Sequence, residues 1–326
     1  MEDMREHIIR TPCDPDITFS DDPLRMMRAV RFAAQLGFDI APETFEAIER
    51  NRERIRIVSR ERIITEINKI VLSPVPSIGF ELMDMTGLLP HVFPEMSRLK
   101  GVEKVGLHGH KDNFTHTLKV LDNVHSTATA CGSLGGYSSR YRQAGNESLR
   151  PAAGWTFHGH EVVGARMVPD IFRRMKLPLN DRMKYVRKLV LLHLRPQILS
   201  DDVVTDSAVR RLLFEAGDDI DDLMTLCEAD ITSGDERKVK RYLKNFAVVR
   251  RKLREIEEKD RVRNFQPPVS GELIMETYGI PPCRIVGEIK DEIKEAILDG
   301  RIANDYGQAY AMMEELAARH GLKRRE

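Results

Sequence analysis

The chain has little cysteine, no long apolar segment and no excess of charge of either sign. Its four cysteines are far apart and never in C-x-x-C spacing, which argues against a disulfide scaffold or a zinc knuckle. No apolar run approaches the ~18 residues of a membrane helix, so we expect a soluble, cytoplasmic protein with no membrane partner. Lys plus Arg and Asp plus Glu both number 51, so any surface for nucleic acid must come from local basic clusters.

Alternating apolar and polar residues, the pattern of a β-strand, are also scarce, and only residues 7–10 offer strand material. From residue 22 onward, apolar residues recur at helical spacing. The expected helices cover 22–37, 42–50, 59–71, 76–85, 113–127, 160–176 and 181–194, with several more between 205 and 319. The predicted fold class is all-α, with an elongated series of helical units.

The segment SDDPLRMMRAVRFAAQLGF, residues 20–38, predicts a helix with clear end signals. Asp22 is suited to cap the helix, Pro23 to occupy its first position and Gly37 to end it. A basic stripe is expected beside the apolar one, formed at three-residue spacing by Arg25, Arg28 and Arg31.

Asp22 and Arg25, held side by side, form a chemical unit that can read the edge of a nucleobase. The Asp accepts one hydrogen and the Arg donates one. Cytosine and adenine present an amine beside an acceptor nitrogen, whereas guanine and uracil present the reverse, so the pair would admit C and A and refuse G and U. The alternative is that Asp22 only caps the helix and pairs with Arg25 one turn on, and the pattern alone favours this alternative.

The longer segment IIRTPCDPDITFSDDPLRMMRAVRFAAQLGF resembles the region of bacterial tRNA nucleotidyltransferases (CCA-adding enzymes) and related poly(A) polymerases that joins the catalytic head to the neck. The segment VSRERIITEINK, residues 58–69, resembles the next family motif, with Ser59 as the helix cap. The end of the chain, from ELIMETYGIPP to AYAMMEEL, is similar to the C-terminal end of the family. The resemblance implies tRNA, CTP and ATP as partners, with the nucleotide bound by Asp21, Asp22, Arg25 and Arg28.

This resemblance divides the chain into a neck (1–95), a degenerate HD-like middle domain (96–235) and a helical, tRNA-binding body and tail (236–326). The tail contains a basic segment, KVKRYLKNFAVVRRKLR, and a second one, RNRERIRIVSRER, spans 50–62. A solvated helix face is the alternative for both segments. The residues expected to bind RNA are Lys238, Lys240, Arg241, Arg250 and Arg251.

The catalytic head of the family has no counterpart before Asp22 in this sequence. That head holds two Mg²⁺ ions on a pair of carboxylates for nucleotidyl transfer. We therefore expect a truncated member of the family, with no catalytic residue, no bound metal and no transfer activity of its own. A separately encoded head would then be a further partner.

The segment GLHGHKDNFTHTLKVLDNV, from Gly106, resembles the opening of an HD-type metal-dependent phosphohydrolase domain. Imidazole and carboxylate ligands suit Mn, Fe, Ni or Mg. A single His on an apolar helix is, however, more often a core residue than a ligand. The ligands that the resemblance implies are His116, His160, His193 and Asp230.

The adjacent His-Asp pair that defines the HD pattern is absent. In its place the chain reads STATACGSLGGYSSRYRQAGNESLRP, which lacks periodicity and is typical of a flexible loop. Residues 139–146 can be encoded by codons that give a different peptide when they are read one nucleotide later. That peptide is HDIGKPA, the missing motif. We therefore expect a reading-frame lesion that removes a core helix over 131–150, and a metal-binding middle domain if it is repaired. Two competing functions remain: an HD phosphohydrolase acting on nucleotides or RNA 3′ phosphates, and a non-catalytic RNA-binding module.

Overall fold

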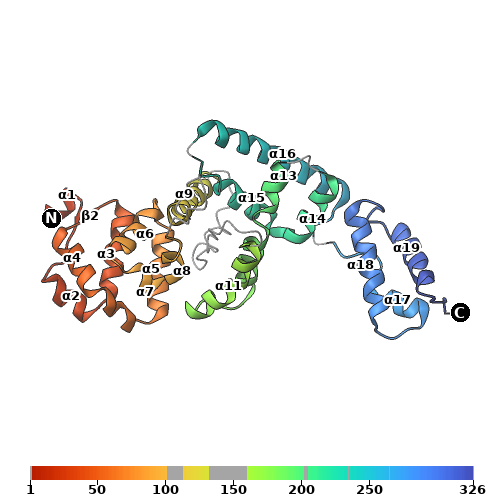
Figure 1. The fold of residues 1–326 in the computed structure, drawn as a ribbon, viewed down its shortest axis with the longest axis horizontal. Coiled ribbons are helices and arrows are strands. Elements are labelled where there is room, and N and C mark those ends of the chain that lie inside the picture. The colour runs from red at the N-terminus through yellow and green to blue at the C-terminus, as the bar shows by residue number, and fades with distance from the viewer. Residues whose placement is uncertain are drawn as a thin grey trace, which may run out of the picture. The chain divides into compact units, whose positions relative to one another are not determined.

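The chain forms two compact helical units in a computed structural model that describes residues 2–100, 113–131, 160–201, 205–233, 235–263 and 265–325. The first unit comprises Met1–Leu191 with Glu228–Gly234, and the second comprises Leu192–Cys227 with Asp235–Glu326 (Figure 1). The expected all-α fold class is confirmed. The expected frame lesion and loop lie outside the described residues, apart from the end of one helix at Cys131. Domain boundaries at 95 and 235 stay a prediction.

The N-terminal part of the first unit is a cluster of short helices with one small pair of strands. Its elements are α1 (Glu2–Glu6), β1 (Ile8–Ile9), α2 (Pro15–Asp21), α3 (Leu24–Leu36), β2 (Asp39–Ile40), α4 (Pro42–Asn51), the 3-10 helix η1 (Arg52–Ile57), α5 (Arg60–Val71), α6 (Pro76–Met85), α7 (Leu89–Val92) and α8 (Pro94–Ser97). Further along the chain follow α9 (Asn113–Cys131), α11 (His160–Arg174) and α12 (Asp181–Leu192).

Helix α3 is central to this cluster, with α5 and α6 packed against it (Figure 1). Its apolar face is fully buried at Met26, Met27 and Val30. Each such side chain contributes roughly 1.5–3 kcal/mol by leaving water. Gly37 ends α3 as predicted, because its left-handed backbone (φ 66°) allows its N–H to bond back to the carbonyl of Ala33 at 2.9 Å.

A single glycine sets how closely α5 and α6 approach. A β-carbon on Gly79 of α6 would collide with Cγ2 of Ile70 on α5 and would lie 3.4 Å from Cβ of Ala34 on α3. Ile70 is fully buried at this crossing. The three helices therefore meet at a point where no side chain larger than hydrogen fits.

Strand β1 pairs in parallel with β2, with Ile8 opposite Asp39 and Ile9 opposite Ile40. The strand expected at 7–10 is therefore present, although it is only two residues long. Its partner was not expected, because β2 follows directly after Gly37 and is too short to show an alternating pattern.

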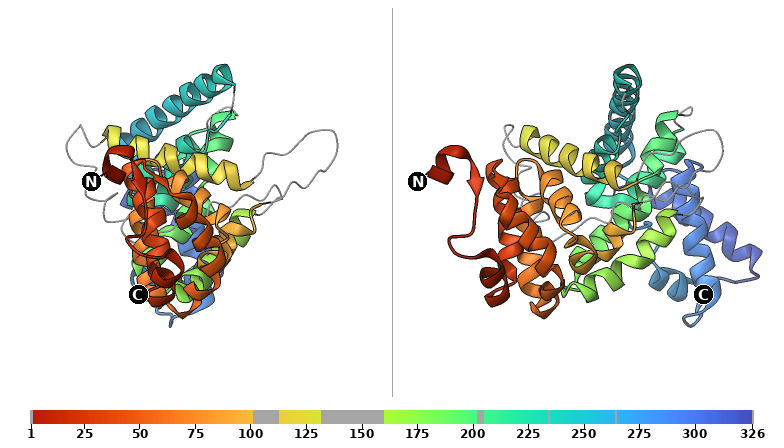
Figure 2. Two further views of the ribbon diagram at one scale, coloured as in Figure 1. Left: turned by 90° about the vertical axis from the view of Figure 1, so that its left-hand side faces the viewer. Right: turned by 60° about the vertical axis from the view of Figure 1, so that its left-hand side comes forward.

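The second unit contains the longest described helix. Its elements are α13 (Arg195–Asp201), α14 (Asp206–Ala216), the 3-10 helix η3 (Gly217–Asp219), most of α15 (Ile220–Ala229), α16 (Glu236–Asp260), α17 (Gly271–Tyr278), α18 (Arg284–Asp299) and α19 (Tyr306–Arg319). The blue helices α18 and α19 lie side by side (Figure 1 and the right-hand view of Figure 2). Within the described ranges, every helix is too short or too polar to cross a lipid bilayer.

Candidate nucleic-acid interface

The predicted base-reading residues lie at the joint between two helices. Helix α2 begins at Asp14, whose side chain accepts from the N–H of Ile17 at 3.0 Å, and ends at Asp21. Asp22 then has an extended backbone (φ −138°, ψ 92°), as a residue before proline prefers. The helix expected to begin at Asp22 therefore begins at Leu24, because α2 occupies the preceding residues.

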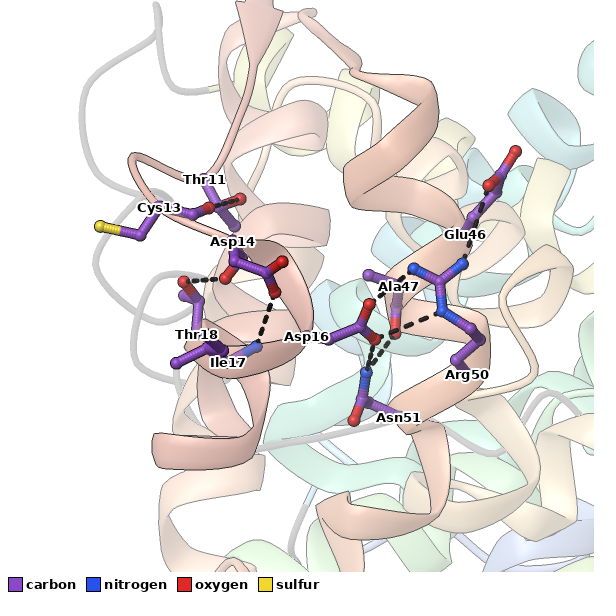
Figure 3. A network of polar contacts seen from close by, with 10 residues as sticks. All are labelled: Thr11, Cys13, Asp14, Asp16, Ile17, Thr18, Glu46, Ala47, Arg50 and Asn51. Carbon is purple, nitrogen blue, oxygen red and sulfur yellow. Dashed lines mark hydrogen bonds and ion pairs between the residues drawn. The ribbon is translucent and has the colours of Figure 1, made fainter.

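Helix α2 is held on α4 by a polar network (Figure 3). Arg50 donates to both carboxylate oxygens of Asp16, at 2.8 and 3.3 Å, and Asn51 donates to the same carboxylate at 2.6 Å. The hydrogen bond from Arg50 holds the pKa of Asp16 below its usual value. The network fixes the direction of α2 and thereby the position of Asp21 at its end.

The carboxylate of Asp22 pairs with Arg62 and not with Arg25. Arg62 Nη2 lies 3.4 and 3.5 Å from the two oxygens of Asp22. Helix α5, which carries Arg62, begins at Ser59 as predicted, because the Ser59 hydroxyl accepts from the N–H of Arg62 at 3.4 Å. Asp22 also accepts from the N–H of Leu24 at 3.3 Å, but the residue at the N-cap of α3 is Pro23.

Three of the predicted nucleotide-binding residues are free to meet a ligand. Asp21, Arg25 and Arg28 are solvent-exposed, and within the described ranges their side chains form no ion pair or hydrogen bond. Arg31, expected in the same stripe, instead turns inward and donates to the buried carboxylate of Glu66 at 2.7 Å. The expected stripe therefore consists of Arg25 and Arg28 alone.

A group of four arginines from η1 and the start of α5, here called the arginine cluster, keeps its full positive charge. In the described part of the chain, each one donates to a neutral acceptor and none is paired with a carboxylate. Arg52, Arg54, Arg56 and Arg60 donate to the Glu49 carbonyl at 2.7 Å, the Ser20 carbonyl at 2.9 Å, His91 Nδ1 at 3.3 Å and the His91 carbonyl at 3.0 Å, respectively. Because Ser20 lies at the end of α2, the cluster adjoins the base-reading residues.

The pKa of His91 is affected by the positive charges of the arginine cluster. Burial lowers the pKa of the His91 imidazole and the positive charge of Arg56 lowers it further, while Glu53 raises it and Arg52 lowers it by smaller amounts. The bond from Arg56 to Nδ1 is made to the neutral ring, with its proton on Nε2. The imidazole therefore stays uncharged, and the positive potential here comes from the arginines.

The first half of α16 carries a second unpaired basic surface. Its basic face, defined as Arg237, Lys240, Arg241 and Lys244, follows the spacing i, i+3, i+4, i+7 and is exposed. The opposite face is buried at Phe246, Val249, Leu253 and Ile256. Within the described ranges these four cations have no carboxylate partner, and neither does exposed Lys238.

Three consecutive cations in the second half of α16 differ, because they are paired with carboxylates. Arg250 lies 3.7 Å from Asp221, Arg251 lies 3.5 Å from Glu255, and Lys252 lies 3.4 Å from Asp206. The predicted RNA-binding set thus divides into free Lys238, Lys240 and Arg241 and paired Arg250 and Arg251. Sequence reasoning missed Arg237 and Lys244, which helical spacing from Lys240 and Arg241 would have found.

Two of the predicted metal ligands meet. His116 on α9 contacts Asp230 (Nε2 to Oδ1, 3.1 Å) and Thr232 (Nδ1 to Oγ1, 2.6 Å). His193 belongs to the second unit, and its carbonyl accepts from Cys227 Sγ at 2.9 Å. His160 begins α11, but its side chain lies outside the described residues. No three His, Cys, Asp or Glu side chains among the described residues gather as a metal would require, so the metal site stays a prediction.

Comparison with known proteins shows which proteins this chain is similar to. A family model described as a probable RNA- and SrmB-binding site of polymerase A matches residues 37–100, which include the arginine cluster. The chain is 27% identical over 313 residues to the A-adding tRNA nucleotidyltransferase of Deinococcus radiodurans, covering 92% of this chain and 69% of that protein. It is 28% identical to the CC-adding tRNA nucleotidyltransferase of Thermus thermophilus, covering 92% and 68%. Over most of its length the chain is therefore similar to tRNA nucleotidyltransferases.

A solved structure of the family shares the fold. The CCA-adding enzyme of Bacillus stearothermophilus, solved with CTP, superimposes with a TM-score of 0.58 at 24% identity, over 98% of this chain and 68% of that one. The chain therefore spans about two thirds of the length of these tRNA nucleotidyltransferases.

Proposed function

We propose that this chain selects the nucleobase and holds the tRNA in a tRNA nucleotidyltransferase that adds C and A from CTP and ATP to the tRNA 3′ end with release of pyrophosphate. One observation carries this function: Asp22 is held from one side by Arg62, while Arg25 is exposed and has no partner among the described residues. Because Asp22 precedes α3 and is held by Arg62, it does not pair with Arg25, whose guanidinium has no partner among the described residues and can meet a base.

The geometry supports a base contact through Asp22 and Arg25. The Asp22 carboxylate offers about four acceptor positions, of which Leu24 and Arg62 use three, so an exocyclic amine can still be accepted. The guanidinium of Arg25 has all its N–H groups available for the ring acceptor of C or A. Arg62 acts as a positioning residue, because it fixes the carboxylate before the base arrives.

The unpaired cations support contacts with phosphate groups. The arginine cluster adjoins the base-reading joint through Ser20, and the basic face of α16 provides a separate surface on the second unit. Contacts of this kind position a nucleic acid without reading its sequence. Sequence choice therefore rests on Asp22 and Arg25, and affinity rests on the arginines and lysines.

Nucleotidyl transfer in this family depends on a divalent metal, which neutralises charge at the triphosphate when bound. No three His, Cys, Asp or Glu side chains gather among the described residues, so no step is assigned to a metal here. We place the reaction in the cytoplasm. The HD-like ligand set, in which only His116 and Asp230 meet, remains a hypothesis for the middle of the chain.

The test measures binding of CTP, ATP, GTP and UTP to the purified chain with a tRNA that lacks its 3′ end. CTP and ATP should bind more tightly, because a good bidentate contact discriminates by about 1–3 kcal/mol, a factor of about 5 to 150. Asp22→Ala and Arg25→Ala should each remove the preference. Gln35→Ala, an exposed and unpartnered position on the same helix, is the control and should keep it.

Equal binding of all four nucleotides by the unmodified chain would refute base selection. If tRNA still bound in that case, the chain would be an RNA-binding module only. If the Asp22 and Arg25 variants keep the preference for CTP and ATP, these residues do not choose the base and are only a helix cap and its neighbour.

A further inference from the structure

The second unit contains a pocket that neither the base-reading joint nor the basic face of α16 uses. The ends of α16 and α18 and the start of α19 form it, and α14 contributes Arg210. Its volume is about 270 Å³, slightly below the ~300 Å³ at which pockets for drug-sized ligands begin. The size suits a small group.

The charges that line the pocket favour an anion. Three cationic side chains, Arg210, Lys259 and Arg301, face one carboxylate, Asp260. That carboxylate is already engaged, because Arg210 Nε donates to it at 2.7 Å. The nearby carboxylate of Asp299 is engaged as well, by Arg211 at 2.8 Å and, across 3.6 Å, by Nε of Arg301, which therefore meets the pocket as a partly balanced cation.

The polar groups left over in the pocket are hydrogen-bond donors. Arg210 is only 11% exposed, yet its two Nη atoms have no acceptor among the described residues. Lys259 likewise has no partner there. The side-chain oxygen of Gln308 is occupied by the N–H of Ala303 at 2.8 Å, which leaves its amide N–H groups to donate.

The pocket lies at the C-terminal ends of α16 and α18, whose dipoles place partial negative charge there. This charge opposes an anion less strongly than the dipoles alone suggest. The carbonyl of Ala296 near the end of α18 accepts from the N–H of Arg301 at 2.8 Å, and that of Ile297 accepts from Gly300 at 3.0 Å. At the end of α16 the carbonyl of Glu257 accepts from Arg261 at 3.0 Å. The negative ends of both helices are therefore partly satisfied within the protein.

Gly300 keeps Arg210 in place over the pocket. Its backbone is left-handed (φ 73°), and a β-carbon at this position would lie 2.6 Å from Arg210 Nη1. The guanidinium therefore reaches into space that any other residue at position 300 would fill. We propose that this pocket binds a phosphate group through Arg210, Lys259, Arg301 and Gln308.

The proposal is tested by titrating inorganic phosphate into the ¹⁵N-labelled chain and following the amide signals of Gly300, Arg301 and Ala303 by NMR. Saturable shifts are expected, and Lys259→Ala combined with Gln308→Ala should weaken binding at least about tenfold, because two donors to the anion are lost. Lys323→Ala, an exposed and unpartnered position of the same unit, should leave binding unchanged. Both pocket residues are exposed, so an unchanged thermal transition shows that the double variant folds.

A second arm adds tRNA and separates the two sources of phosphate. Displacement of inorganic phosphate by tRNA, with weaker tRNA binding in the double variant, assigns the pocket to the RNA backbone. Loss of phosphate binding with unchanged tRNA binding assigns it to free phosphate or pyrophosphate. Shifts that chloride reproduces at equal ionic strength, or equal phosphate binding by the double variant, overturn the proposal. The phosphate arm does not require tRNA binding, so its result is independent of the proposed function.

Discussion

The two halves of α16 allow a matched test of which cations contact RNA. Lys240→Ala with Lys244→Ala removes two exposed charges that have no carboxylate partner in the described structure. Arg251→Ala with Lys252→Ala removes two charges from the same helix that lie 3.5 and 3.4 Å from carboxylates. Alanine is the best helix former, so neither pair should unfold α16.

The expected magnitude follows from counterion release. Each phosphate contact contributes about −0.7 to −0.9 to the slope of log K against log salt concentration, depending on whether the RNA is single-stranded or a duplex. Losing both lysines should make the slope shallower by about 1.4 to 1.8. The control pair should change it by much less, because carboxylates already balance those charges and few counterions are released there.

Fluorescence anisotropy with labelled tRNA, repeated between about 50 and 300 mM salt, measures this slope. The reasoning is refuted if the control pair flattens the slope as much as the lysine pair does. It is also refuted if the lysine pair leaves the slope unchanged, because the basic face would then be only a solvated surface.

Three further variants test the first unit. Glu66→Gln should lower the free energy of unfolding by about 3–5 kcal/mol in denaturant titrations, because it leaves the buried Arg31 guanidinium without its carboxylate. Gly79→Ala should cost about 1–3 kcal/mol in the same assay, because the added methyl group overpacks the crossing of α5 and α6. Arg56→Ala should raise the pKa of His91 in an NMR titration of its ring protons, because a neighbouring positive charge that lowers this pKa is removed.

Controls and further measurements can contradict these predictions. Lys69→Ala, which removes a half-exposed partner of Glu66, should cost less than about 1 kcal/mol, and an equal cost for both changes would contradict the buried-pair account. Because the folded pKa of His91 lies below its unfolded value of about 6.5, the unfolded state binds more protons, and stability should fall as pH drops through that value. A His91 pKa that stays fixed in Arg56→Ala would show that burial alone sets it.

Local signals in the sequence predicted much of the helical structure. The cap at Ser59, the end of α3 at Gly37 and the bounds of α6 at Pro76–Met85 agree with the structure, because each depends on residues within one turn. Helix α2 was missed although Asp14 followed by Pro15 is a start signal. The helix is only seven residues long, and its stability depends on the contact of Asp16 with Arg50, 34 positions away.

Pairing between distant residues explains what the sequence could not predict at the site. Steps of three residues fall about 60° short of a full turn, so Arg31 lies about 120° around α3 from Arg25 and reaches the edge of the buried face. There it meets Glu66, 35 positions further on, just as Asp22 meets Arg62 at a separation of 40. A pattern within one helix shows neither partner, so it cannot distinguish a buried ion pair from an exposed stripe.

Because the chain has as many acidic as basic residues, the cations that have no carboxylate partner among the described residues are significant. With 51 basic and 51 acidic residues, the chain has enough carboxylates to pair every Lys and Arg. Three consecutive cations in the second half of α16 are paired in this way. At the base-reading joint, the arginine cluster and the first half of α16, the described side chains instead leave cations exposed to water or bonded to neutral groups. Grouped like charges repel one another, so such groups destabilise the fold unless an anion is bound. The polyanion that fits both units of this chain is the tRNA of our proposal.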